Sequence, residues 1–324
     1  MTQATARAHT NIALIKYWGK QDEQLKLPQN NSLSLTLDHF YTDTTVIFDS
    51  SIATDDFQLD GQKLAPQNAI KIQQLIDHVR QLSGQTAHAQ VISTNHVPTS
   101  AGLASSASGF AALAAAASKA AGLDLTQRDL SRLARRGSGS ASRSIFGGFA
   151  EWQKGDSDET SYAVPIQETV DWEIAMLTVV VTAKEKKISS SVGMKRSVLT
   201  SPYYSAWVAN ATQDLTQIKQ AIASQNFEQV GQISERNAMR MHALTLSSDP
   251  SFTYFNADSL KVMQAVNQLR DAGIPCYYTM DAGPNVKIIC RPTDAPKITA
   301  VLSADFAPDQ LILAQPGPGI SYLD

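Results

Sequence analysis

The chain has 324 residues, of which 43% are hydrophobic and 18% are charged, and its formal net charge is −3. This composition is ordinary for a folded protein and argues against disorder, while the slight negative charge excludes a general attraction to nucleic acid or anionic membranes. At about 150 residues per domain, the length predicts two joined lobes and a sizeable core. We therefore expect a small-molecule partner, with phosphate recognition at local sites.

Cysteine content and the N-terminal segment bear on the compartment. The two cysteines, Cys276 and Cys290, have no Cys/His cluster around them, so we expect two buried thiols and neither a disulfide nor a zinc site. The first residues lack the basic-then-apolar pattern of a secretory signal, and no uninterrupted apolar run reaches about 18 residues. These features predict a cytoplasmic protein.

The first half of the chain alternates between strand and helix patterns. A period of two with many β-branched residues predicts strands, and apolar residues three or four positions apart predict a helix. An alanine-rich run has strong helix propensity, and Thr126 with Asp129 predicts a capping box at the next helix. The predicted elements are strands at 33–37, 41–48 and 90–94, and helices at 68–81, 105–121 and 126–135.

The second half begins with a loop of small residues and later becomes mostly helical. One of its strands is so continuously apolar that we expect it to be central in a sheet. The predicted elements are a loop at 137–142, strands at 145–152, 174–181, 277–280 and 286–290, and helices at 205–223, 227–241 and 259–272. Near residue 185 the pattern changes from mixed strands and helices to mainly helices. This change predicts an N-terminal ATP-binding lobe over residues 1–184 and a C-terminal lobe over residues 185–324.

Residues Pro98–Gly109 form a glycine- and serine-rich turn that leads directly into the alanine-rich helix. The free N–H groups at a helix N-terminus favour a phosphate. No Gly-Lys-Ser/Thr follows the glycines, so this is not a Walker loop. A well-capped helix on a small-residue packing surface remains an alternative for this segment.

This run resembles the nucleotide-phosphate motif of the superfamily that groups galactokinase, homoserine kinase, mevalonate kinase and phosphomevalonate kinase. Three more segments, Ile15–Lys20, Gly137–Gly148 and Met280–Asn285, resemble in matching order the diphosphomevalonate decarboxylase family within it. The resemblance implies an α+β, two-lobed small-molecule kinase fold. Its N-terminal lobe would be ribosomal protein S5-like and its C-terminal lobe ferredoxin-like, with the active site in the cleft between them.

The resemblance also implies an activity and its partners. ATP would be the co-substrate, Mg²⁺ the metal, mevalonate 5-diphosphate the substrate and isopentenyl diphosphate the product, in the mevalonate pathway of isoprenoid and lipid biosynthesis. Relatives suggest a homodimer. The alternatives are a mevalonate-type 3-kinase or phosphomevalonate kinase of the same superfamily, and a non-catalytic nucleotide-binding sensor.

Three residues are expected to carry the chemistry. Asp281 would accept the proton of the substrate 3-hydroxyl as the γ-phosphoryl group is transferred, although a turn-forming aspartate is the alternative. Arg143 offers a planar fork that suits a carboxylate, and by resemblance it binds the substrate carboxylate; a surface ion pair is the alternative. Lys16 is expected near the reacting oxygen.

The other site residues follow the family pattern. Hydroxyls and glycine N–H groups of the 137–142 loop suit a diphosphate. Trp18 could equally be a core residue. The implied substrate contacts are Tyr17, Trp18, Gly19, Lys20, Lys71, Ser138, Gly139, Ser140, Ala141, Ser142, Arg143, Ser190 and Ser191. The implied ATP contacts are Ser93, Asn95, Pro98, Ser100, Gly102, Leu103, Ala104, Ser105 and Ser106, and Ser106 is also the implied Mg²⁺ ligand.

Overall fold

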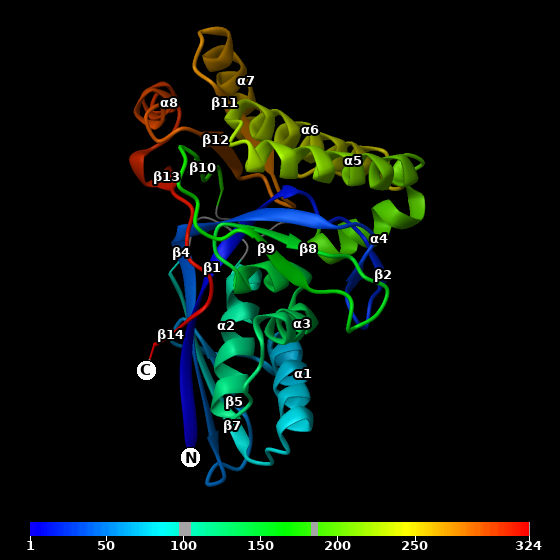
Figure 1. The fold of residues 1–324 in the computed structure, drawn as a ribbon, viewed down its shortest axis with the longest axis vertical. Helices are drawn as coiled ribbons and strands as arrows, with labels where there is room; N and C mark the ends of the chain where they lie inside the picture. Colours follow the sequence, from blue (N-terminus) through cyan, green and yellow to red (C-terminus); the bar gives the residue numbers. More distant parts are fainter. Residues whose placement is uncertain (97–104, 183–186, 324) are drawn as a thin grey trace.

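The computed structural model describes residues 1–96, 105–182 and 187–323, and it has the mixed α+β fold that was expected (Figure 1). Within these residues no helix is both long and apolar enough to cross a membrane. Two sheets carry the site, and a third, two-stranded sheet joins β2 (Lys20–Asp22) to β3 (Leu27–Pro28).

The first sheet is built on two long antiparallel strands, β1 (Thr2–Ile15) and β4 (Ser32–Asp49). Its main path has the order β14-β1-β4-β7-β5-β6; off this path, β8 pairs with β4 and β9 pairs with β8. The remaining strands are β5 (Asp56–Leu59), β6 (Gln62–Lys63), β7 (His88–His96), β8 (Phe149–Trp152), β9 (Ala163–Gln167) and β14 (Ser321–Tyr322).

Three helices cover one face of this sheet: α1 (Pro66–Ser83), α2 (Ser105–Ala120) and α3 (Gln127–Gly137) (Figure 1). Buried alanines of β1 and α2 belong to one hydrophobic core, and their small side chains let the helix lie close to the strand. The α3 N-cap is as predicted, because Asp129 N donates to Thr126 Oγ1 at 3.2 Å.

The second sheet has the antiparallel order β11-β12-β10-β13. Its strands are β10 (Ala175–Val179), β11 (Cys276–Met280), β12 (Val286–Cys290) and β13 (Leu311–Ala314). The apolar strand predicted to be central is β10, and it is an interior strand. The two cysteines are buried and free.

Helices lie on both faces of the second sheet. A core with α7 (Ala257–Asp271) and α8 (Ala295–Leu302) fills one face. A second core with α5 (Tyr204–Ala223) and α6 (Phe227–Leu246) fills the other face and also contains residues of β1 and β4. The two sheets therefore share a hydrophobic core. The remaining elements are α4 (Ser190–Thr200) and a short 3₁₀ turn, η2 (Pro308–Gln310).

Two local expectations were wrong. The predicted loop at 137–142 is largely a 3₁₀ helix, η1 (Gly139–Ile145), and the strand predicted at 145–152 begins only at Phe149. Short serine- and glycine-rich segments can take several turn conformations, so tertiary contacts decide among them. The sequence also left α8 and β13 unpredicted. The lobe division at 184/185 stays a prediction, and β10, which precedes it, pairs within the second sheet.

Candidate active site

Lys16 and Asp281 meet where the two sheets adjoin. Lys16 directly follows β1, and Asp281 directly follows β11. Lys16 Nζ donates to Asp281 Oδ1 at 2.8 Å and to Ala13 O at 2.6 Å. The Lys16 side chain is 2% exposed and that of Asp281 is 32% exposed, so the carboxylate opens to solvent while the ammonium lies behind it.

Asparagine side chains fix the backbone on both sides of this pair. Asn237 of α6 accepts from Lys16 N at 2.8 Å, and Asn30 Nδ2 donates to Lys16 O at 2.9 Å. The turn after Asp281 is held by Asn285 Oδ1, which accepts from Val181 N at 2.8 Å. The reacting groups are therefore mounted on a fixed backbone.

A second lysine lies beside the same carboxylate. Lys287 Nζ in β12 is 3.7 Å from Asp281 Oδ2, and its side chain is 6% exposed. Burial alone would raise the pKa of Asp281, but Lys16, Lys287 and Arg143 outweigh it and hold that pKa well below its usual range. Burial lowers the pKa of Lys16 and of Lys287, against the opposing effect of Asp281. The carboxylate is thus kept ionised.

Arg143 lies in η1 and is 2% exposed. Its Nε donates to Ser34 Oγ at 2.9 Å and to Asn11 Oδ1 at 3.3 Å, and its Nη1 donates to Ser32 Oγ. In the described part of the chain, no carboxylate lies within ion-pair distance of it. Burial lowers the pKa of Arg143 to about 10, with Asp281 opposing this shift. A buried guanidinium with neutral contacts is suited to an anionic ligand.

The residues after Lys16 divide between the site and the core. Tyr17 packs edge-on against Trp152, and its hydroxyl is buried without a protein partner among the described residues. Its electrostatic coupling to Arg143 places it at the same site. Trp18 is 2% exposed and packs on Tyr254, so its role as a substrate contact stays a prediction. Gly19 lies beneath the hydroxyl of Tyr204.

The serine segment beside Arg143 is ordered by its own contacts. Ser138 Oγ and Ser140 Oγ are 3.3 Å apart, and Asn11 Nδ2 donates to Ser140 O at 3.0 Å. Ser142 is buried and its hydroxyl donates to Gly139 O at 2.7 Å, so this side chain caps the turn. Alanine in place of Gly139 would put its Cβ 2.7 Å from the Trp152 ring, and Ala141 is fully buried.

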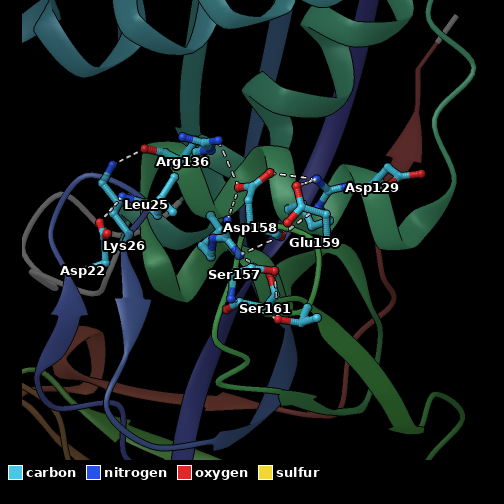
Figure 2. Close-up of polar contacts among 12 residues, drawn as sticks. Asp22, Leu25, Lys26, Asp129, Arg136, Ser157, Asp158, Glu159 and Ser161 are labelled. Atoms are coloured by element: carbon cyan, nitrogen blue, oxygen red, sulfur yellow. Dashed lines mark hydrogen bonds and ion pairs between the residues drawn. The ribbon is translucent and has the colours of Figure 1, made fainter.

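A basic group of Lys20, Lys26, Lys71 and Arg136 lies near the start of this serine segment. Lys26 Nζ donates to Gly137 O at 2.7 Å and to Arg136 O, the last carbonyls of α3 (Figure 2). Burial, together with the charges of Lys71, Lys20 and Arg136, lowers the pKa of Lys26 to about 8. Several cations close together, without an equal number of carboxylates, favour a multiply charged anion.

Asp158 holds α3 from the opposite side (Figure 2). Its Oδ2 is 2.7 Å from Arg132 Nη2, and its Oδ1 contacts Arg135 and lies 3.1 Å from Arg136 Nη2. Because Lys26 binds the carbonyl end and Asp158 the arginines, the helix end that precedes Ser138 is fixed on two sides.

The expected ATP contacts are only partly described. Pro98, Ser100, Gly102, Leu103 and Ala104 lie outside the described residues. Helix α2 begins at Ser105, and Ser106 in its first turn is exposed. Buried Ser108 fixes this helix start, because its Oγ lies 2.8 Å from Thr42 Oγ1 and 3.3 Å from Thr10 Oγ1.

Ser93 and Asn95 lie on β7. Ser93 Oγ is 2.9 Å from Thr44 Oγ1, while the Asn95 backbone N and Nδ2 donate to Asp60 at 2.7 Å and 3.1 Å. Asp60 also lines a surface depression of about 460 Å³, together with Leu59, Gln62, Lys63, Leu64, Ala65 and Asn68. This depression lies beside the expected nucleotide residues.

The remaining predicted residues lie at two helices. Ser190 and Ser191 form the first turn of α4, whose N-cap is Ser189, and Ser191 is exposed. Lys71 is exposed on α1 and is tied to the site through its effect on Lys26. The structure thus brings Lys16, Asp281, Arg143 and Tyr17 together at one point.

Sequence reasoning missed several residues that build the site. Lys287 is a single lysine in an apolar strand, which is a signal that could have been noticed. Asn11, Ser32 and Ser34 hold Arg143 from β1 and β4, but nothing in their local pattern distinguishes them from ordinary strand residues. His242 is buried next to Met280 O, and burial with the Lys16 charge lowers its pKa to about 3, so it is neutral.

Comparisons with known proteins cover nearly the whole chain. Residues 8–163 match the family model described as diphosphomevalonate decarboxylase-like N-terminal domain, and residues 176–316 match the mevalonate 5-diphosphate decarboxylase C-terminal domain. The diphosphomevalonate decarboxylase of Candida albicans is 34% identical over 94% of this chain and 89% of its own length.

Solved structures agree with these matches. The mevalonate diphosphate decarboxylase from Enterococcus faecalis is 50% identical over 100% of this chain and 99% of its own, with a TM-score of 0.94. A complex described as "MDDEF in complex with MVAPP, AMPPCP and Magnesium" is 51% identical over 100% of this chain and 99% of its own, with a TM-score of 0.95.

Proposed function

The chain belongs to the diphosphomevalonate decarboxylase family, and on that premise we propose which of its residues perform each part of the reaction. The enzyme uses ATP and Mg²⁺ to decarboxylate mevalonate diphosphate. The reaction yields isopentenyl diphosphate, ADP, phosphate and carbon dioxide, by way of phosphorylation of the 3-hydroxyl.

One observation carries the assignment of roles. Asp281, beside two lysines, and the buried Arg143, which has no carboxylate in contact among the described residues, lie close enough to shift each other's pKa. Three cations and one carboxylate leave this point positively charged, although the whole chain is slightly negative. A substrate that carries a hydroxyl, a carboxylate and a diphosphate matches these groups in kind and charge.

Asp281 is the proposed base for the 3-hydroxyl. The same cations that keep it ionised make it a weak base, so proton transfer follows the transfer of the phosphoryl group, when the hydroxyl becomes acidic. Lys16 uses two of its three N–H donors on Asp281 and Ala13, and the third is available for the reacting oxygen or the transferred phosphoryl group.

Arg143 is the proposed partner of the substrate carboxylate. Departure of phosphate from the tertiary carbon leaves positive character there, and loss of carbon dioxide supplies the electrons of the new double bond. The free side of the guanidinium would orient the carboxylate for this step, and the contacts to Ser32, Ser34 and Asn11 would keep it in place.

The diphosphate is assigned to the basic group and the serine segment. Lys20, Lys71, Ser138 and Ser140 would bind it, with Lys26 acting through the α3 carbonyls that it holds. Tyr17, Gly139, Ser190 and Ser191 are proposed to line the same substrate site, and Ser142 contributes by shaping the turn.

ATP is assigned to the first sheet and α2. The free N–H groups of the α2 N-terminus suit its phosphates, and the depression beside Asp60 and Asn95 would take its nucleobase. Mg²⁺ neutralises charge on the phosphates when bound. The exposed hydroxyl of Ser106, in the first turn of α2, would be the ligand for Mg²⁺ from this chain.

Four broader assignments complete the proposal. We place the enzyme in the cytoplasm as a homodimer that serves isoprenoid and lipid biosynthesis. We also divide the chain into an ATP-binding lobe over residues 1–184 and a C-terminal lobe over residues 185–324.

The stoichiometry of the products tests the proposal. Purified protein with Mg·ATP and mevalonate 5-diphosphate should release ADP, phosphate and carbon dioxide in equal amounts. ADP without carbon dioxide would identify a 3-kinase instead. No ADP with any mevalonate derivative, despite measurable ATP binding, would indicate a nucleotide-binding sensor.

A further inference from the structure

Lys287 is a buried cation in a strand of otherwise apolar residues, Val286–Cys290. Its ammonium donates to Asn285 O at 3.2 Å and lies 3.7 Å from Asp281 Oδ2. Among the described residues, Asp281 is its ion-pair partner. A buried charge is stable only when it is paired, so this lysine depends on that carboxylate.

The neighbours of Lys287 across the sheet offer it no second acid. Thr279 of β11 and Thr178 of β10 stand directly opposite it, on the sheet face that packs on α5 and α6. Both threonine hydroxyls are buried without a hydrogen-bond partner in the described part of the chain. The position therefore holds a lysine whose one strong interaction is with Asp281.

Asp281 is held at both carboxylate oxygens. Lys16 binds Oδ1 from the end of β1, and Lys287 lies beside Oδ2 from β12. Arg143 of η1 is the third cation that acts on it, and the nearby His242 of α6 is neutral. Two contacts on opposite oxygens restrict rotation of the carboxylate, whereas one contact would leave it free to turn.

We propose that Lys287 is a positioning residue for the decarboxylase reaction, holding Asp281 Oδ2 from behind so that the carboxylate keeps one orientation toward the substrate hydroxyl. This inference rests on the base role proposed for Asp281. Lys287 acts through that residue, because Asp281 is its ion-pair partner among the described residues and the carboxylate of Asp281 is open to solvent.

Lys287→Met tests the inference, because methionine has a similar length and suits the apolar strand. We expect kcat to fall roughly 10- to 100-fold, as misorientation of a reacting group does. The KM for mevalonate diphosphate should change much less than kcat, since Lys287 is proposed to act on the reaction through Asp281. Thr178→Val is the matched control: it removes a polar atom beside Lys287 but no charge, and kcat should stay within twofold of the wild type.

A double-mutant cycle separates positioning from packing. In an Asp281→Asn background, Lys287→Met should change the residual single-turnover rate less than twofold, because the residue it positions is already lost.

Other results would overturn the inference. They are a kcat within twofold of the wild type, an equal loss in both backgrounds, or a fall in kcat that Thr178→Val reproduces. If the wild type itself releases no carbon dioxide, the proposed function fails rather than the role of Lys287. If Asp281→Asn leaves turnover intact, the base assignment fails.

Discussion

Lys16 and Asp281 are 265 positions apart in the chain, yet their side chains meet at 2.8 Å. One follows the first strand of the first sheet and the other follows β11 of the second sheet. Their contact therefore depends on how the two sheets pack, and the core shared by β1, β4, β10 and β12 sets that packing. The packing that stabilises the fold therefore also positions the Lys16–Asp281 pair.

Replacement of Asp281 should separate binding from turnover. Asp281→Asn keeps the size and much of the hydrogen bonding but removes the proposed base, so we expect kcat to fall about 10²- to 10⁴-fold. Calorimetric titration should show mevalonate diphosphate bound within a few-fold of the wild-type Kd.

The control for this change is Asp55→Asn. Asp55 is another carboxylate with a cationic partner, Arg80 of α1, but it directly precedes β5 and lies outside the site. The Asp55→Asn variant should be less stable than the wild type but should have the same kcat. Unaltered turnover in Asp281→Asn would remove Asp281 from the mechanism.

Replacement of Arg143 by lysine keeps the charge and removes the planar fork. The shorter reach and single ammonium cannot satisfy Ser32, Ser34 and Asn11 and also bind a carboxylate. We expect kcat/KM for mevalonate diphosphate to fall roughly 10- to 100-fold, the loss of a charge-assisted hydrogen bond worth about 1.5–3 kcal/mol.

The control is Arg270→Lys, whose kcat/KM, measured by steady-state kinetics, should stay within twofold of the wild-type value. That arginine also makes a two-pronged contact, to Glu235, but outside the site. An Arg143→Lys enzyme with wild-type kcat/KM would contradict the assignment of the carboxylate.

Lys26 gives the stability of the protein a specific pH dependence. Its pKa in the folded chain is about 8, below the 10.5 of a free lysine, so the unfolded chain binds more protons between these values. The contribution of Lys26 to the free energy of unfolding should therefore rise with pH across that window, by at most about 1.4 kcal/mol per pH unit.

Lys26→Met removes this titration. In urea unfolding, the wild-type free energy of unfolding minus that of Lys26→Met should become more positive from pH 7.5 to pH 10. A constant difference for Lys26→Met would mean that Lys26 is not crowded by the other cations.

Features of the fold that depend on local interactions could be predicted from the sequence, and those that depend on long-range contacts could not. Long periodic elements such as α2 and α5 were predicted within a few residues, because their patterns are local. Membership of β10 in the second sheet could not be predicted, because it depends on pairing with strands more than a hundred residues later. The 3₁₀ geometry of η1 likewise depends on contacts from β1 and β4.

The site residues also divide into those visible in the local sequence and those defined by tertiary contacts. Asp281, Arg143 and Lys16 stood out through motifs, since each lies in a short segment of unusual composition. Their supporting residues did not, because Ser34, Asn237 and Lys287 acquire their roles only through tertiary contacts. Residue types that can do the chemistry are visible in a sequence, whereas the contacts that orient them are not.

Gly19 tests whether the segment after Lys16 tolerates any side chain. Its φ is +106°, and a Cβ would lie 1.9 Å from Tyr204 Oη, which donates to Trp18 O at 2.7 Å. Gly19→Ala should therefore destabilise the protein by about 2–4 kcal/mol in urea unfolding, through backbone strain and the clash. Gly109→Ala, in helix α2 with open space around the new Cβ, should be neutral or stabilising by up to about 1 kcal/mol.

Combining Gly19→Ala with Tyr204→Phe distinguishes the two causes. Removing the hydroxyl relieves the closest contact but leaves the strained φ, so the double variant should recover part of the loss relative to the sum of the single changes. Strict additivity would assign the whole effect to the backbone. A Gly19→Ala protein as stable as the wild type would show that the Trp18–Tyr204 contact does not hold this segment in place.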